Sequence, residues 1–144
     1  EKFSEKYHGV SLIIIGGHGT LYSQTLEYAN NSDADIIIIK SMKNPMPILK
    51  QCDFFMLSSY YEGLGLTLLE ADALGIPTMS TDIPGPQGFV SDHDGYLVET
   101  SEKGLRKGMA AFMKGEVKAM NVDYDRYNKE AVEHFDSLFK SSGR

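Results

Sequence analysis

Apolar runs and stretches of helical periodicity alternate along the whole chain. Runs of branched, aromatic or small residues predict buried strands at residues 10–15, 36–39, 54–57, 78–81 and 96–98. Caps, prolines and apolar residues three or four apart predict helices at residues 20–28, 45–52, 66–74 and 87–90, another from Ser101 onward, and a last one within residues 121–144. This alternation predicts an α/β fold, with a Rossmann-like, mostly parallel sheet and helices on both of its faces.

Individual side chains predict how these helices begin and which of their residues face the core. Thr20 or Ser23 is the expected N-cap of the first helix, because a hydroxyl can accept a hydrogen bond from a free amide at a helix start. The strand at residues 36–39 is apolar on both faces, which predicts helices on both sides of the sheet. In the helix after Ser101, the residues expected to face the core are Leu105, Met109, Phe112 and Met113. In the last helix, one apolar face is expected from Tyr124, Tyr127, Ala131, Phe135, Leu138 and Phe139.

The most informative stretch is residues 58–77, with the sequence SSYYEGLGLTLLEADALGIP. A strand turns into a helix there, at two glycines one residue apart, Gly63 and Gly65. Gly75 and Pro77 then end the helix. Glycines let a diphosphate approach the backbone closely, and free amides at a helix start attract anions. The stretch therefore predicts a phosphate-binding corner.

Two carboxylates, Glu62 and Glu70, bracket this corner. A carboxylate beside phosphate would repel it, so hydroxyl groups are the better ligands for both. Eight residues of helical rise separate the pair by at most ~12 Å, about the reach of a sugar, a diphosphate and a ribose. A nucleotide-sugar therefore fits, with Glu62 on the sugar, the amides of residues 63–66 on the phosphates and Glu70 on the ribose. The structural alternative is that the helix dipole favours Glu62 and that Glu70 is merely solvated.

The run YEGLGLTLLEADALGIPTMSTDIPGP resembles the donor-binding signature of retaining glycosyltransferases of the GT-B fold, in family four, the glycosyl transferases group 1. That signature is a glutamate, seven residues and a second glutamate, here Glu62 and Glu70, and the resemblance spans roughly residues 10–98. It implies retaining transfer of a sugar from a nucleotide-diphosphate donor to a glycan, a glycolipid or a cell-wall polymer. It assigns Glu62 to the catalytic site, and it implies donor contacts by Gly63, Leu64, Gly65, Leu66, Thr67 and Glu70, with Ser41 and Met42 against the nucleobase.

The resemblance also implies parts that this sequence does not contain. The family's donor domain opens with a strand whose Arg and nearby Lys hold the diphosphate, and that strand should precede Glu1. The acceptor is bound mainly by a separate N-terminal domain. Residues 1–144 are therefore expected to be a single C-terminal nucleotide-sugar-binding domain, a fragment that is inactive alone and that self-associates through an open sheet edge. Neither a metal nor another cofactor is expected.

Composition and charge narrow the class further. Hydrophobic residues make up 42% and charged residues 24%, as in ordinary globular proteins, and the net charge of -6 argues against nucleic-acid binding. Cys52 is the only cysteine, so no internal disulfide can form, which fits a reducing cytoplasm. The resemblance also implies that the full-length parent lies peripherally at the inner face of the membrane. No apolar run approaches the ~20 residues of a membrane span.

Several features have competing interpretations. Residues 16–19 could cradle phosphate, but a tight turn is favoured because the G-x-G-x-x-G spacing is absent. Asp92, His93 and Asp94 could suggest a metal, but a turn at Asp94 explains them better. The alternatives for the whole chain are a GT-B sugar-nucleotide epimerase, a glycosidase, and a non-catalytic nucleotide-binding or receiver-type module. The paired glutamates argue against the epimerase, the glycine turn against the glycosidase, and the lack of acidic residues after the first strand against the receiver.

Overall fold

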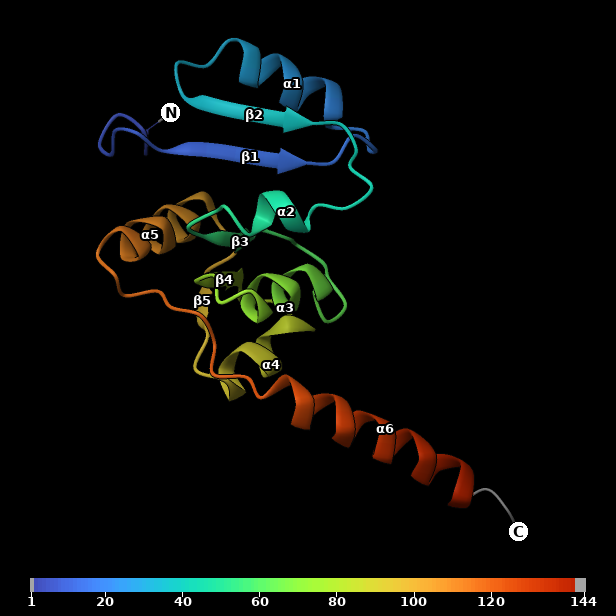
Figure 1. The fold of residues 1–144 in the computed structure, drawn as a ribbon. Coiled ribbons are helices and arrows are strands. Elements are labelled where there is room, and N and C mark those ends of the chain that lie inside the picture. Colours follow the sequence, from blue (N-terminus) through green and yellow to red (C-terminus); the bar gives the residue numbers. More distant parts are fainter. Residues whose placement is uncertain (1, 142–144) are drawn as a thin grey trace. The chain divides into compact units, whose positions relative to one another are not determined.

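The computed structural model describes residues 2–141, and the chain divides into two compact units, residues 1–49 and 50–144 (Figure 1). Each unit is an α/β arrangement in which every strand pair is parallel. The strands form a two-stranded sheet in the first unit and a three-stranded sheet in the second. This confirms the prediction of parallel sheets flanked by helices. Within the described residues, no helix is long and apolar enough to cross a bilayer.

The first unit contains β1 (Ser11–Ile15), α1 (Tyr22–Asn30), β2 (Asp35–Ile39) and the short α2 (Met46–Leu49). The strands pair in register, from Ser11 opposite Asp35 to Ile15 opposite Ile39. The predicted strands are thus confirmed to within one residue. The predicted cap of α1 is wrong, because Leu21 is the N-cap and no side chain bonds the first amides.

Side chains of the first unit are less buried than the sequence suggests. None of residues 2–49 is fully buried, and Leu12, Ile15 and Ile37 are exposed. Within residues 36–39 of this unit, Ile37 is exposed and the other three isoleucines are half-buried. The reason is the size of the unit, because two strands and the one long helix that packs along β2 bury little apolar surface.

The second unit contains β3 (Phe55–Leu57), α3 (Leu66–Ala73), β4 (Thr78–Thr81), α4 (Pro86–Asp92), β5 (Tyr96–Val98), α5 (Glu102–Met113) and α6 (Tyr124–Ser141). Its sheet has the order β3-β4-β5, so β4 is the central strand. Helices α3 and α4 enclose a core with residues from the sheet and from the segment before α6: Leu57, Leu68, Leu69, Phe89, Val90 and Met120. The buried hydrophobic residues all belong to this second unit.

Helix α5 packs on the sheet through small residues. Its buried positions are Gly104, Gly108 and Ala111, whereas Met113 is exposed. A Cβ at Gly108 would overlap the Met79 sulfur and lie 2.8 Å from Cγ1 of Val98. Of the residues expected to face the core, Leu105, Met109 and Phe112 are half-buried, and the expectation is wrong for Met113. Glycine lets the helix backbone approach the sheet closely, and the larger residues lie to either side, as where Phe112 stacks on Phe54 with ring centroids 4.5 Å apart.

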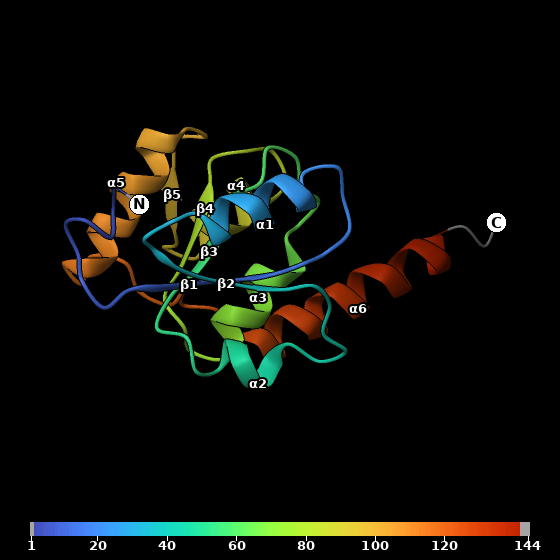
Figure 2. The ribbon, with the colours of Figure 1, turned by 90° about the horizontal axis from the view of Figure 1, so that it is seen from above.

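Helix α6 is anchored at its beginning. Tyr124 and Tyr127 pack against the core cluster, and a carboxylate oxygen of Asp123 accepts a hydrogen bond from the Arg126 amide at 3.0 Å. Further along, α6 runs away from the β3–β5 sheet in both views (Figure 1, Figure 2). The remainder of its predicted apolar face is exposed to solvent, from Ala131 to Phe139.

Candidate functional site

The corner between β3 and α3 is built on a glycine. Gly65 is the N-cap of α3, with φ 79° and ψ 59°, a left-handed conformation that favours glycine. A Cβ at Gly65 would also stand only 2.9 Å from a methyl carbon of Leu57, at the end of β3. The glycine therefore allows the start of α3 to lie close against the end of β3, with residues 58–65 forming the loop that connects them.

The beginning of α3 has free hydrogen-bonding capacity. The amides of Leu68 and Leu69 donate to the carbonyl of Gly65, at 2.8 and 3.4 Å. The amides of Leu66 and Thr67 precede them in the first turn, where a helix offers no carbonyl acceptor, and no side chain caps this end. This end also carries the positive pole of the helix dipole. Its chemistry suits an anion.

The second predicted carboxylate lies on the open side of the same helix. Leu68, Leu69 and Asp72 are buried, which fixes the opposite side of α3 as the exposed one. Glu70 is exposed and follows Leu66 by four residues, so the two are neighbours on one helix face. Glu70 is therefore on the solvent-accessible face that begins at the helix N-terminus.

The first predicted carboxylate is held within its own loop. Glu62 is exposed, and its two carboxylate oxygens accept hydrogen bonds from the Ser59 hydroxyl at 3.3 Å and from the Gly63 amide at 3.2 Å. Of the amides predicted to bind phosphate, that of Gly63 is thus already engaged. The remaining backbone donors of the corner are those of residues 64–67.

The surroundings of this loop include side chains that sequence patterns did not single out. Tyr60 and Tyr61 are strongly exposed in the loop, and Tyr61 is 94% accessible. The Thr81 hydroxyl at the end of β4 donates to the carbonyl of Ser59 at 2.6 Å. Since residues 59 and 81 are 22 positions apart, no local pattern could have revealed their contact.

Helix α3 is also tied to the start of α6. Asp72 is 5% exposed, and its carboxylate accepts hydrogen bonds from the Met120 amide and from the Tyr124 hydroxyl, the latter at 2.8 Å. The same hydroxyl lies 3.1 Å from the carbonyl of Leu69. Burial, and after it the hydrogen bond to Asp72, raises the pKa of Tyr124 above its ordinary value. Asp72 therefore helps to fix the helix that carries Glu70.

Ser41 and Met42 belong to the first unit, directly after β2. Ser41 is exposed and Met42 is half-buried. Their contact with a nucleobase stays a prediction.

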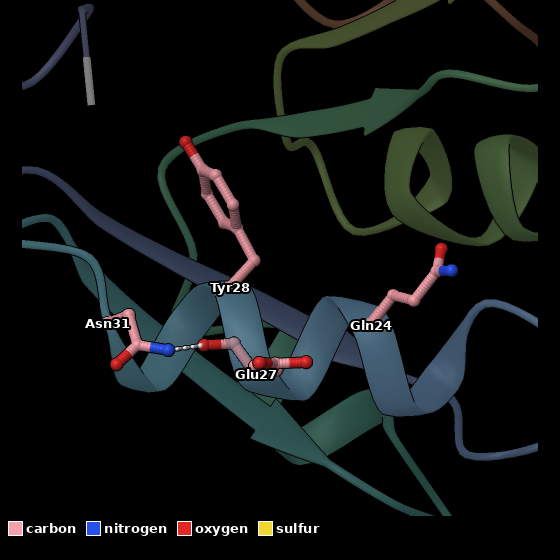
Figure 3. Close-up of a pocket in the computed structure, with 4 residues that line it drawn as sticks. All are labelled: Gln24, Glu27, Tyr28 and Asn31. Atoms are coloured by element: carbon pink, nitrogen blue, oxygen red, sulfur yellow. Dashed lines mark hydrogen bonds between the residues drawn. The ribbon is translucent and has the colours of Figure 1, made fainter.

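Two hollows in the first unit are lined by residues other than the paired glutamates. One, of about 380 Å³, is lined by Gln24, Glu27, Tyr28 and Asn31, all from α1 and its C-cap (Figure 3). There the Asn31 side-chain amide donates to the carbonyl of Glu27 at 2.9 Å. The other, of about 370 Å³, lies at the glycine loop of residues 16–19 and the beginning of α1. Neither hollow brings together an acid, a base and a nucleophile.

Among the residues that the structure describes, no group of three or more His, Cys, Asp or Glu side chains is placed to hold a metal ion. His93 instead bonds the carbonyl of Phe89 at 2.8 Å, and Asp94 makes a turn with φ 57°. Burial, and then the neighbouring Asp53, raises the pKa of Cys52, which keeps this half-buried residue in its less reactive thiol form.

The sequence profile of the family described as Glycosyl transferases group 1 matches residues 1–131. The chain belongs to this family. An α-1,3-galactosyltransferase of Escherichia coli is 33% identical to this group 1 chain over 97 residues, which cover 64% of the chain and 25% of the relative. The name of that relative gives UDP-Gal and α-D-GlcNAc-diphosphoundecaprenol as its substrates. An uncharacterized glycosyltransferase of Methanocaldococcus jannaschii is 37% identical over 84 residues, covering 57% of the chain and 20% of the relative.

A peptide N-acetylglucosaminyltransferase subunit, GtfA of Streptococcus pneumoniae, is 35% identical over 88 residues, covering 60% of the group 1 chain and 17% of the relative. Among solved structures, the GT-B glycosyltransferase TarM matches 80% of the chain with a TM-score of 0.69 and 21% identity. This likeness establishes the fold. The chain spans about a quarter of TarM, and a quarter or less of each of these three relatives.

Proposed function

We propose that the β3–α3 corner binds a nucleotide-diphosphate sugar, and that the protein containing it transfers the sugar, with retention, to a glycan, a glycolipid or a cell-wall polymer. Membership of the group 1 glycosyltransferases supports the transferase chemistry. The names of relatives supply examples of such substrates: UDP-Gal and UDP-N-acetylglucosamine as donors, and a diphosphoundecaprenol-linked sugar as an acceptor.

The exposed face of α3 is the observation that carries the proposal. It joins an uncapped helix N-terminus to Glu70 one turn later, and the loop just before it presents Glu62 to solvent. We assign the phosphates to the amides of residues 64–67, the ribose to Glu70 and the sugar hydroxyls to Glu62. The nucleobase is assigned to Ser41 and Met42.

In this arrangement the helix terminus stabilises the leaving group. As the bond to the anomeric carbon breaks, negative charge grows on the diphosphate, and amides already aimed at it need no reorganisation. Each hydrogen bond to a charged group contributes about 1.5–3 kcal/mol. Glu62 orients the sugar through its hydroxyls and is not assigned as a nucleophile. The proposal requires no metal and no cofactor apart from the donor.

The chain alone is proposed to bind donor weakly and to transfer no sugar. Support comes from the matched relatives, of whose length the chain covers between 17% and 25%. The reaction is placed at the inner, cytoplasmic face of a membrane, in keeping with the lipid-linked substrate in the name of the Escherichia coli relative.

The test is calorimetric titration of the chain with UDP- and GDP-sugars, comparing the wild type with Glu70→Ala. Loss of the ribose contact at about 1.5–3 kcal/mol predicts roughly 10- to 100-fold weaker binding. Glu133→Ala, which removes an exposed glutamate from α6, is the matched control and should leave the affinity unchanged. Equal affinities for wild type and Glu70→Ala would rule out the ribose assignment.

A further inference from the structure

We propose that Thr81 and Gly85, neither of which belongs to the paired-glutamate signature, are positioning residues that hold Glu62 in place. This inference rests on the proposed function, since it concerns how the sugar-binding carboxylate is aimed. Both residues come from the end of β4 and the turn into α4. They contact the backbone of the Glu62 loop and need not touch the donor.

A chain of two hydrogen bonds leads from the sheet to the carboxylate. Thr81 is 1% exposed and ends the central strand, and its hydroxyl donates to the carbonyl of Ser59 at 2.6 Å. The hydroxyl of Ser59 in turn donates to a carboxylate oxygen of Glu62 at 3.3 Å. The direction of an exposed side chain is thereby linked to a residue fixed in the core.

Gly85 supports the same loop by close contact. Its φ is 105°, and a Cβ there would overlap the carbonyl oxygen of Gly63 and stand 2.6 Å from that of Glu62. The two peptide groups on either side of Gly63 therefore rest against the bare Cα of Gly85. Pro84 and the buried Pro86 flank this glycine and restrict the backbone of the turn.

Such support matters because Glu62 lies on an exposed loop. A glutamate that is free to rotate loses rotamer entropy when it binds a ligand, whereas one held beforehand does not. Displacement of a positioning group by about 1 Å can lower the rate of a reaction by two orders of magnitude. Thr81 and Gly85 would thus set how much of the donor's binding energy is available for catalysis.

Thr81→Val and Thr81→Ser separate the hydrogen bond from the packing. Valine keeps the shape of threonine and removes the donor to Ser59, whereas serine keeps the donor. We expect Thr81→Val to weaken nucleotide-sugar binding at least fivefold and to shift the amide resonances of Glu62 and Gly63 in the ligand-free chain. Thr81→Ser should restore both properties to near the wild-type values. If valine and serine behave alike, the hydrogen bond has no positioning role.

Gly85→Ala tests the close contact, with Gly75→Ala as its matched control. Both glycines have positive φ, so both alanines suffer backbone strain, but a Cβ at Gly75 would meet no atom within 4 Å. Gly85→Ala should therefore move the Gly63 resonance and weaken binding at least fivefold, while Gly75→Ala leaves both unchanged. Equal effects of the two alanines would overturn the proposed contact.

The positioning role can fail separately from the proposed function. If the wild type binds no UDP- or GDP-sugar, the proposed function fails, and the positioning role is then judged in ligand-free protein. There the side-chain carboxyl carbon shift of Glu62 and the amide shifts of Glu62 and Gly63, measured at pH 7, should differ between Thr81→Val and the wild type. If the wild type does bind a nucleotide-sugar while Thr81→Val and Gly85→Ala bind it equally well, the positioning role alone is refuted.

Discussion

The hydrogen bond between Tyr124 and Asp72 should contribute measurably to the stability of the second unit. Tyr124→Phe removes only the hydroxyl that donates to the Asp72 carboxylate at 2.8 Å. A hydrogen bond to a charged group is worth about 1.5–3 kcal/mol. Tyr124 is half-buried, so water can partly replace the lost hydroxyl, and we expect a loss near the lower limit, about 1.5 kcal/mol.

Asp72→Ala should cost more, because it removes the acceptor of both Tyr124 and the Met120 amide. Two lost bonds predict a decrease of about 3 kcal/mol in the free energy of unfolding. In the Asp72→Ala background, Tyr124→Phe should have little further effect, so the double-mutant cycle should give a coupling energy of about 1.5 kcal/mol.

The assay is urea unfolding followed by far-UV circular dichroism at pH 7. The stability change is taken from the transition midpoint when the slope is the same in every variant. Tyr61→Phe is the control, because Tyr61 is 94% exposed and should tolerate the change within ~0.5 kcal/mol. A Tyr124→Phe variant as stable as Tyr61→Phe, or a cycle with no coupling, would refute the assigned role of this bond.

Three further predictions follow from the same structure. Tyrosine in the unfolded chain ionises at about pH 10, whereas the pKa of Tyr124 in the folded chain is raised, so the stability from this hydroxyl is complete below about pH 10 and is lost as the pH rises above it. The difference in unfolding free energy between wild type and Tyr124→Phe should therefore shrink when urea unfolding is repeated at alkaline pH, and a constant difference would contradict this. Gly104→Ala should lower the free energy of unfolding by about 1–3 kcal/mol, because its Cβ would overlap the Glu99 carbonyl oxygen. Gly88→Ala is the control, because a Cβ at Gly88 would meet no atom within 4 Å, and equal unfolding midpoints for the two variants would count against this packing. In hydrogen exchange, the amides of β1 and β2 should exchange faster than those of β3–β5, because residues 2–49 contain no buried side chain, and the opposite order would be inconsistent with that exposure.

Local patterns were sufficient to predict the strands and the glycine corner. Branched apolar runs mark β1 and β2, and the pair Gly63 and Gly65 marks the place where β3 turns into α3, because these signals lie within a few neighbouring residues. The exposed position of Glu70 follows from the same helical periodicity. Sequence reasoning failed where the outcome depends on segments far apart in the chain.

The buried carboxylate of Asp72 illustrates this limit. Its partners, Met120 and Tyr124, are 48 and 52 residues away, and nothing near Asp72 in the sequence indicates them. The packing of α5 through Gly104 and Gly108 was missed for a related reason, because hydrophobicity identifies large side chains and not the places where two backbones approach closely. The contacts of Ser59 with Thr81 and of Gly63 with Gly85 likewise depend on the order of strands in the sheet.

The most direct test of the proposed donor site is amide-resonance mapping of the ¹⁵N-labelled chain during titration with UDP- and GDP-sugars. The proposed site predicts saturable shifts that are largest for residues 62–70, with weaker changes at Ser41 and Met42. Shifts confined to other segments, such as the α1 hollow of residues 24–31, or no saturable shift at residues 62–70 with any of these donors, would contradict it.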